Sequence, residues 1–523
     1  MRSSRVVAGV LVSGMVAGSV QAQLRIVQWN VTNYSSGRVA DFQNAIYGSF
    51  NGRSMNPDVI IAEEIVGSSG AVNFRNMLNT RAGGPTDWQF AAFADFPGDT
   101  DNALFYRASR VSVLEVVTLD AGTGSGAGQP PRPNERYRVR LAGYASAGAE
   151  MYLYAAHMKA GSTGGDRDRR TPEAQRLRDD AEMLPAGSHF ILGGDFNMQS
   201  WTEPAYQVLV SSMANNAGRF IDPIKSPGAV TTPGSWNGNS AYRIVHTQDP
   251  ATCDAACGSG CNGGGMDDRH DQLLISAGFA DGNGLEYIGN VNATFSTSTW
   301  DDPNHSYRTW GNDGSSFNCR LNTASNQMVG NLIAQSLVTA ANGLGHLPVL
   351  LDVQVPAKVS SVSFIDFGSV GVGTVATRPL SVANGVNVAL WSRDGNGTGI
   401  DDLDYTLSAT GGFSAPGGMF SAAAAVPGNV HTITMPTGTP GMQAGTVTIN
   451  SDDPDQPAWV VVVVGMVEEA ACACDWDQSG SLGSQDFFDF LADFFEGNGD
   501  FNHSGATTSQ DFFDFLVCFL GGC

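Results

Sequence analysis

The residues His189-Phe190-Ile191-Leu192-Gly193-Gly194-Asp195-Phe196-Asn197 join a short apolar run to polar side chains at its end. A continuous apolar run of this kind is typical of a strand that is covered on both faces. With one residue between them, Asp195 and Asn197 share one side of an extended backbone. The stretch therefore predicts a buried strand that delivers a carboxylate and an amide to one end of a sheet.

Other parts of residues 24–355 repeat this design, in which a short apolar run carries a ligand-capable residue at one end. These runs are residues 24–30, 58–64, 151–157, 271–275 and 346–351. Thr171-Pro172-Glu173 is expected to open a helix, because Thr can cap it and Pro fits its first position. Strands and helices alternate along this segment, so the sequence predicts an α/β fold.

The order of these strand ends resembles the endonuclease/exonuclease/phosphatase superfamily, the metal-dependent phosphoesterases that include pancreatic-type deoxyribonuclease and neutral sphingomyelinases. The motifs that carry the resemblance are Trp29-Asn30, Glu63-Glu64-Ile65, His157-Met158-Lys159, Gly194-Asp195-Phe196-Asn197, Arg269-His270-Asp271 and Gly345-His346-Leu347-Pro348-Val349. The resemblance implies that residues 24–355 form a four-layer α/β sandwich, in which two mixed sheets are flanked by helices.

The resemblance also implies a metal site. Glu64 is the expected ligand of Mg²⁺ or Mn²⁺, with Asn30 as a neutral oxygen beside it. A hard divalent ion prefers such oxygen ligands and keeps several waters. Glu63 is expected to point elsewhere, since the second acid of the pair precedes the apolar Ile65.

Catalytic roles follow from the same resemblance. Asp195 would orient or deprotonate the attacking water, while Asn197 would hold that water or a phosphoryl oxygen. Asp271 would pair with His346 and favour its protonated form, which would stabilise developing negative charge. His157 would contact the phosphate or assist the departure of the leaving group.

One position departs from the family pattern. The family usually has Ser-Asp-His before its last strand, whereas this chain has Leu344-Gly345-His346. That carboxylate usually supports metal binding or the histidine, so the sequence leaves open whether one or two catalytic metals bind. A non-catalytic relative is the alternative that this departure favours.

A cluster of basic residues allows two interpretations. It is either a solvated helix face balanced by neighbouring acids or a patch that positions phosphate. Its members are Arg167, Arg169, Arg170, Arg176 and Arg178. The whole chain has a formal charge of −23, so a polyanionic substrate would need metal cations or a local basic patch. The acidic composition also excludes a basic nucleic-acid scaffold.

Residues 1–22 have the pattern of a secretory signal peptide: Arg2 and Arg5, a short apolar run and small residues up to Ala22. We therefore expect a secreted or cell-surface protein. No internal apolar run reaches the roughly 18 residues of a transmembrane segment. Export permits disulfides among the eight Cys residues. For Cys253, Cys257 and Cys261, zinc ligation is the alternative.

Residues 356–467 predict an all-β module. Short strands at 363–368, 380–385, 445–450 and 459–465 indicate a β-sandwich. The segment resembles immunoglobulin-like modules of secreted and cell-surface bacterial proteins. It contains no catalytic constellation, so we interpret it as a spacer or a binding module.

Residues 470–523 contain a duplicated loop and helix with an offset of 25 residues. Oxygen-bearing side chains at loop positions 1, 3, 5 and 12, with a backbone carbonyl at position 7, have the spacing of a Ca²⁺ loop. The expected ligands are Asp475, Asp477, Ser479, Ser481 and Asp486 in the first copy, and Asp500, Asn502, Ser504, Ala506 and Asp511 in the second.

This small α-helical calcium-loop duplicate resembles a dockerin of the bacterial type that ends in Gly-Cys, as residues 522–523 do. The resemblance implies a cohesin-like or cell-surface docking partner. The helices are expected to expose their apolar side chains, Phe490 and Phe515 among them. Cys472 or Cys474 is expected to pair with Cys518 or Cys523.

Together these features predict a secreted, metal-dependent phosphodiester hydrolase carried on a docking module, with extracellular nucleic acid as its substrate. Hydrolysis of lipid or sugar phosphates is the alternative within the fold. A non-catalytic, docked structural or adhesion protein is the alternative from another class.

Overall fold

The structure is a computed structural model of the chain, and it describes residues 24–96, 99–119, 132–224, 235–251, 264–392, 399–469 and 471–522. The expected signal peptide and the group Cys253, Cys257 and Cys261 lie outside the described residues. In the described ranges, every helix is too short or too polar to cross a membrane.

Two β-sheets form the centre of residues 24–355. The first contains β1 (Leu24–Tyr34), β2 (Val59–Ile65), β3 (Trp88–Phe90), β4 (Asp101–Arg107), β10 (Glu286–Tyr287), β11 (Arg308–Thr309) and β12 (Val349–Gln354). The second contains β5 (Val111–Thr118), β6 (Glu135–Leu141), β7 (Glu150–His157), β8 (His189–Asp195) and β9 (Asp271–Ile275). The strand orders are β10-β12-β1-β2-β4-β3, with β11 beside β12, and β5-β6-β7-β8-β9. Since β1 and β2 are parallel, as are β7 and β8, both sheets are mixed, as predicted.

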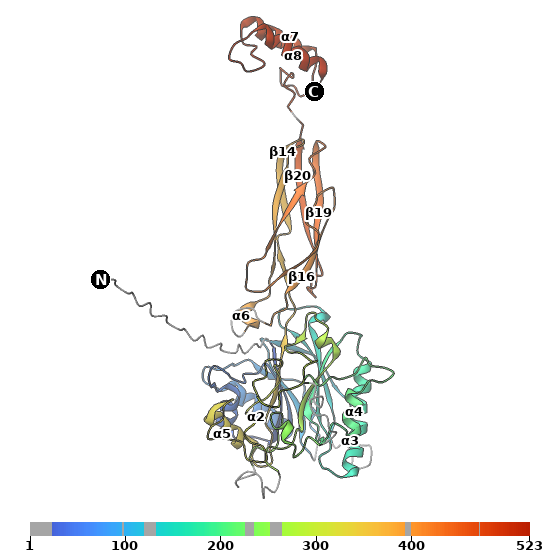
Figure 1. Ribbon diagram of the computed structural model, residues 1–523, viewed down its shortest axis with the longest axis vertical. Coiled ribbons are helices and arrows are strands. Elements are labelled where there is room, and N and C mark those ends of the chain that lie inside the picture. Colours follow the sequence, from blue (N-terminus) through green and yellow to red (C-terminus); the bar gives the residue numbers. More distant parts are fainter. Residues whose placement is uncertain are drawn as a thin grey trace, which may run out of the picture.

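Helices cover the outer face of each sheet (Figure 1). They are α1 (Val39–Tyr47), α2 (Gly67–Asn79) and α5 (Gly330–Ala341) on the first sheet, and α3 (Gly164–Glu182) and α4 (Pro204–Val210) on the second. Ile61 and Ile191 belong to the apolar core between the sheets. Gly193 allows the close approach there, because a Cβ atom at this position would lie 2.9 Å from Ile61 Cδ1. The predicted four-layer α/β arrangement is therefore present.

The predicted start of helix α3 is wrong. The helix begins at Gly164 and runs through Pro172. Thr163 caps it, with its hydroxyl accepting from Asp166 N while the Asp166 carboxylate accepts from Thr163 N. The Thr171 hydroxyl instead donates to a carbonyl one turn earlier, so the Thr-Pro pair lies inside a helix that the capping box has already started.

Residues 356–468 form two further sheets. One contains β13 (Val359–Ser361), β15 (Ala376–Asn384) and β18 (Asn429–Met435), and the other contains β14 (Phe364–Gly371), β16 (Leu403–Ala409), β17 (Met419–Ala422), β19 (Gly441–Ser451) and β20 (Ala458–Glu468). Leu380 and Ile433 of one sheet share a core with Val447 and Val463 of the other. The four predicted strands are thus present, as β14, β15, β19 and β20, and the short helix α6 (Val388–Trp391) leaves the sheets toward the first part of the chain.

Direct contacts join these sheets to the first part of the chain. The Asp455 carboxylate accepts hydrogen bonds from the backbone N–H groups of Ala145 (2.9 Å) and Ser146 (2.8 Å). Lys358, which is paired with the same carboxylate, donates through Nζ to the carbonyl of Gly143 at 2.6 Å. Trp391 of α6 lies under the guanidinium of Arg110. The two parts therefore meet through polar and aromatic contacts, and not only through the connecting chain.

The C-terminal helices α7 (Ser484–Glu496) and α8 (Ser509–Gly521) lie at the far end of the molecule (Figure 1). Phe490 and Phe515 are fully buried and stack with ring centroids 3.9 Å apart, so the expectation that they are exposed is wrong. The repeat offset of 25 residues brings these equivalent rings together across the pair of helices. The expected disulfide at this end is confirmed as Cys474–Cys518.

Candidate active site

Ligand-capable residues from both sheets meet at one end of the central strands. His157 on β7 and Asp271 on β9 are the two register partners of Asp195 on β8. Asn30 on β1 and His346, just before β12, come from the other sheet and contact the same carboxylate. The structure thus brings together residues that are separated by up to 316 positions, counting from Asn30 to His346.

Asp195 lies at the centre of this site and is 2 % exposed. Its Oδ2 atom accepts a hydrogen bond from Asn30 Nδ2 at 3.1 Å and lies 3.5 Å from His157 Nε2 and 3.6 Å from His346 Nε2. Its Oδ1 atom accepts from the backbone N–H of Asn197 at 3.0 Å. The Asn197 side chain donates to the Met158 carbonyl at 3.3 Å, so its proposed contact with water or phosphate stays a prediction.

The predicted pairing of His346 with Asp271 is confirmed, with 2.7 Å between Nδ1 and Oδ2. Burial opposes a charge on His346, but the carboxylates of Asp271 and Asp195 outweigh it and raise the pKa of the imidazole to about 10. Gln28 Nε2 donates to Asp271 at 3.0 Å and to Glu63 at 2.7 Å. Glu63 therefore points into the space between the sheets, as predicted, and supports Asp271 through Gln28.

The second imidazole, that of His157, is neutral, in contrast to the charged ring of His346. Burial, together with the charges of Arg132 and His346, holds the pKa of His157 well below its ordinary value. Its Nδ1 atom is buried and has no hydrogen-bond partner within the part of the chain that the structure describes. Asp195 is thus flanked by a cationic His346 and a neutral His157, and the neutral ring can offer one N–H to a phosphate oxygen.

Irregular backbone directs Glu64 toward Asp195. The register of β1 and β2 shifts between Asn30 and Tyr34, and Glu64 itself has a φ of +62°. Such bulges reorient side chains next to functional sites. Glu64 Oε1 accepts from Asn30 Nδ2 at 3.0 Å, and Oε2 accepts from Asn33 N at 2.9 Å.

These groups fit a hard divalent ion. Glu64 is only partly buried, and the Asn30 amide joins it to the second carboxylate, Asp195. Carboxylate and amide oxygens are the ligands that Mg²⁺ and Mn²⁺ accept. The amide oxygen of Asn30 accepts from Thr32 N at 3.0 Å, so metal ligation by Asn30 stays a prediction.

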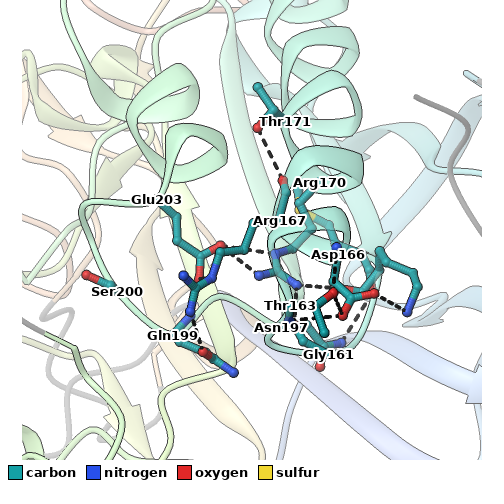
Figure 2. A network of polar contacts seen from close by, with 12 residues as sticks. Gly161, Thr163, Asp166, Arg167, Arg170, Thr171, Asn197, Gln199, Ser200 and Glu203 are labelled. Atoms are coloured by element: carbon teal, nitrogen blue, oxygen red, sulfur yellow. Dashed lines mark hydrogen bonds and ion pairs between the residues drawn. The ribbon is translucent and has the colours of Figure 1, made fainter. Parts of the chain in front are cut away.

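Two arginines of the basic cluster on α3 have structural roles, and Figure 2 shows one of them, Arg170. Arg170 is fully buried and donates to Glu203 at 2.8 Å and to the carbonyls of Lys159 and Gly161. Arg178 is also fully buried and donates to the backbone carbonyls of Val208 in α4 and Ser211 just after it. For these two residues both interpretations, a solvated helix face and a patch that positions phosphate, are therefore wrong. Because Glu203 also accepts from Gln199 N, Arg170 ties the loop after His157 to the loop after Asp195.

Sequence reasoning missed two groups beside the site. Gln28 connects Glu63 to Asp271, and its only signal was a polar residue inside an otherwise apolar strand. Asp268 lies close enough to His346 and Asp195 for their charges to affect it, but no strand end pointed to it. Both become visible only when distant segments are placed side by side.

A family model for endonuclease/exonuclease/phosphatase proteins matches residues 27–504. The chain belongs to the endonuclease/exonuclease/phosphatase family. Members of this family are hydrolases that act on phosphoesters and generally depend on a divalent metal. The acids and histidines around Asp195 are the residue types that such a reaction uses.

Several solved structures are similar to this endonuclease/exonuclease/phosphatase chain. The catalytic domain of human Nocturnin with bound sulfate is 13% identical, covering 64% of this chain and 94% of that one, with a TM-score of 0.38. D. rerio TDP2 complexed with a single-strand DNA product is 15% identical, covering 64% and 99%, with a TM-score of 0.34. A Bacteroides thetaiotaomicron mannosyl-6-phosphatase is 13% identical, covering 63% and 99%, with a TM-score of 0.33. No curated protein matches the chain.

The charge on His346 predicts a pH-dependent stability. Its folded pKa of about 10 lies above the roughly 6.5 of an unfolded histidine, so its contribution is complete below pH 6.5 and is lost as pH rises toward 10. Urea unfolding at pH 6, 8 and 10 should show a free energy of unfolding that falls more steeply in the wild type than in His346→Gln. Equal slopes in the two proteins would contradict a charged His346.

Proposed function

We propose that this protein is an exported, metal-dependent phosphodiester hydrolase that acts on extracellular nucleic acid. The observation that carries the proposal is the position of Asp195 between a charged His346 and a neutral His157, with Glu64 linked to it through Asn30. A base, a cation and a metal-binding carboxylate are what hydrolysis of a phosphodiester requires.

Each residue has a defined task in this proposal. Asp195 accepts the proton of the water that attacks phosphorus, and the bond to the leaving oxygen breaks as the new P–O bond forms. The imidazolium of His346, fixed by Asp271, stabilises negative charge on the phosphoryl oxygens. His157 donates a hydrogen bond to the same group. Glu64 holds a divalent ion, which would neutralise phosphate charge when bound.

Nucleic acid is the proposed substrate because family members act on phosphodiesters such as nucleic acids. The buried roles of Arg170 and Arg178 remove them as phosphate contacts, so the metal and His346 carry the attraction for a polyanion. A screen should compare DNA, RNA, sphingomyelin and sugar phosphates with Mg²⁺, with Mn²⁺ and with EDTA. Cleavage of DNA or RNA only with metal is expected. Preferential cleavage of sphingomyelin or a sugar phosphate would replace the substrate, and no cleavage at all would favour a structural or adhesion role.

We further propose that the two-sheet segment is an immunoglobulin-like spacer and that residues 470–523 are a dockerin-like calcium module that holds the enzyme outside the cell. The carboxylates of Asp475, Asp477 and Asp486 approach within 4.8 Å of one another. The backbone N–H groups of Ser479 and Gly480 donate to Asp475, at 3.0 and 2.8 Å. In the second loop, Ser504 and Gly505 donate to Asp500 in the same way, which supports a duplicated ion site.

Calcium should stabilise this module. The helices share a small core around Phe490 and Phe515, and small domains often need metals or disulfides. In the full chain, adding Ca²⁺ should raise the temperature at which α7 and α8 lose helical circular dichroism and slow proteolysis of residues 470–523. Asp475→Ala combined with Asp500→Ala should abolish both effects without reducing phosphodiester cleavage.

The control is Asp489→Ala, which removes a partly buried acid of α7 outside the loop. It should keep the full response to Ca²⁺. A wild-type chain that binds no Ca²⁺ by calorimetry would refute the calcium module.

A further inference from the structure

Asp268 and His270 form an acid–imidazole pair next to the candidate active site. His270 Nδ1 donates to Gln248 Oε1 at 2.6 Å, so the Nε2 atom of the neutral ring carries a lone pair. This Nε2 atom is buried and has no hydrogen-bond partner among the described residues, and the residue is 8% exposed. The carboxylate of Asp268 lies beside it, with 3.9 Å between Nε2 and Oδ2.

The backbone places this pair beside the catalytic groups. Gln248 forms β-bridges to both Asp268 and His346, and the carbonyl of His270 accepts from Phe196 N at 2.9 Å. The pair therefore lies on the segments that flank His346 on one side and Asp195 on the other. Burial and the charges of Asp267 and Asp195 raise the pKa of Asp268 to about 7, although the nearby charge of His346 opposes this rise.

Gly345 stands where the family usually has an aspartate, and the packing around it leaves no space for a larger side chain. A Cβ atom at Gly345 would lie 2.2 Å from the carbonyl oxygen of Ala341 at the end of α5. An aspartate at position 345, where the family usually has one, therefore cannot be accommodated without moving the helix end. Asp268 lies on another segment, which is joined to His346 through Gln248, and it brings a carboxylate near His346.

We propose that Asp268 and His270 form a second divalent-metal position, separate from the one at Glu64, which holds an ion such as Mn²⁺ against a phosphoryl oxygen of the substrate. The inference rests on the proposed function. Two ligands of one ion with bonds of about 2.1 Å can lie up to about 4.2 Å apart, and the observed 3.9 Å is within this limit. An imidazole and a carboxylate suit Mn²⁺, and two protein ligands leave room for water and phosphate.

The experiment counts metal ions in the full-length chain. Mn²⁺ binding is measured by electron paramagnetic resonance, with the C-terminal loops filled beforehand with Ca²⁺. The wild type is expected to bind two Mn²⁺ ions, and Glu64→Gln, Asp268→Asn and His270→Asn are each expected to lose one of them or to bind it at least tenfold more weakly. His270→Asn keeps a side-chain N–H for Gln248 while removing the Nε2 ligand.

The matched control is Asp267→Asn, the neighbouring acid, whose charge acts on Asp268 but whose own pKa responds to Asp249 and not to Asp195 or His346. It should bind two ions like the wild type. A nitrogen coupling to Mn²⁺ should also disappear in His270→Asn and persist in Asp267→Asn. If His270→Asn does not fold, Asp268→Asn decides the question alone.

A wild type that binds a single Mn²⁺, or Asp268→Asn that still binds two with unchanged affinity, would overturn the second position. Because the readout is the number of ions, it stands whether or not a substrate is cleaved. Loss of the ion with no cleavage of any phosphodiester would instead refute the proposed function and leave the metal position intact.

Discussion

Replacing Asp195 with asparagine should lower the rate of metal-dependent phosphodiester cleavage by a factor of about 10² to 10⁴. The amide has nearly the shape of the carboxylate, but its single oxygen can accept only one of the two hydrogen bonds that Asn30 Nδ2 and Asn197 N donate to Asp195. It cannot accept the proton of the attacking water, and it removes the negative charge that lies 3.6 Å from His346 Nε2. His346→Gln should show a loss of about 10² to 10³, because it removes the cation that stabilises the phosphoryl oxygens. Initial rates on whichever substrate the screen identifies provide the measurement.

The fold of both variants must be intact for this comparison. Thermal unfolding should remain cooperative, and Asp179→Asn, an exposed acid on α3, should keep the wild-type rate. Wild-type turnover in Asp195→Asn and His346→Gln would refute the assignment of this site.

Replacing Arg269 with methionine should lower the free energy of unfolding by about 3–5 kcal/mol, since it leaves a buried carboxylate unpaired. Arg269 is fully buried and donates to Asp222 through its two terminal guanidinium nitrogens, Nη1 and Nη2, at 2.9 and 3.1 Å. It also lies over the ring of Trp236, at 5.2 Å from the centroid. Because Arg269 immediately precedes His270 and Asp271, the variant should lose activity as well. Urea unfolding provides the measurement.

The double variant Arg269→Met with Asp222→Asn tests the physical cause. It removes the unpaired charge, so it should recover part of the lost stability. Glu115→Gln, which breaks an exposed ion pair with Arg136, is the matched control and should cost no more than about 1 kcal/mol. A double variant as unstable as Arg269→Met alone would show that packing, and not the buried charge, dominates.

Local sequence determined which segments become the central strands and which residues stand at their ends. The run that ends at Asp195, the two acids near the end of β2 and the histidines at 157 and 346 were all found from apolar runs of a few residues. Burial on both faces demands such runs, so this signal does not depend on the rest of the chain. The offset of 25 residues in the C-terminal repeat is local in the same sense.

The tertiary structure alone decided how these ends combine. His346 and Asp271 are 75 residues apart, and only the pairing of β8 with β9 and of β1 with β12 brings them within 2.7 Å. The same long-range packing buries Arg170 and stacks Phe490 on Phe515, which their local patterns did not predict. A side chain's periodicity reports whether it faces a core, but the charges and rings that it meets there belong to distant segments. Sheet register and the contact between the two sheets determine which side chains come into contact. They therefore also determine the pKa of His346 and the position of Asp268.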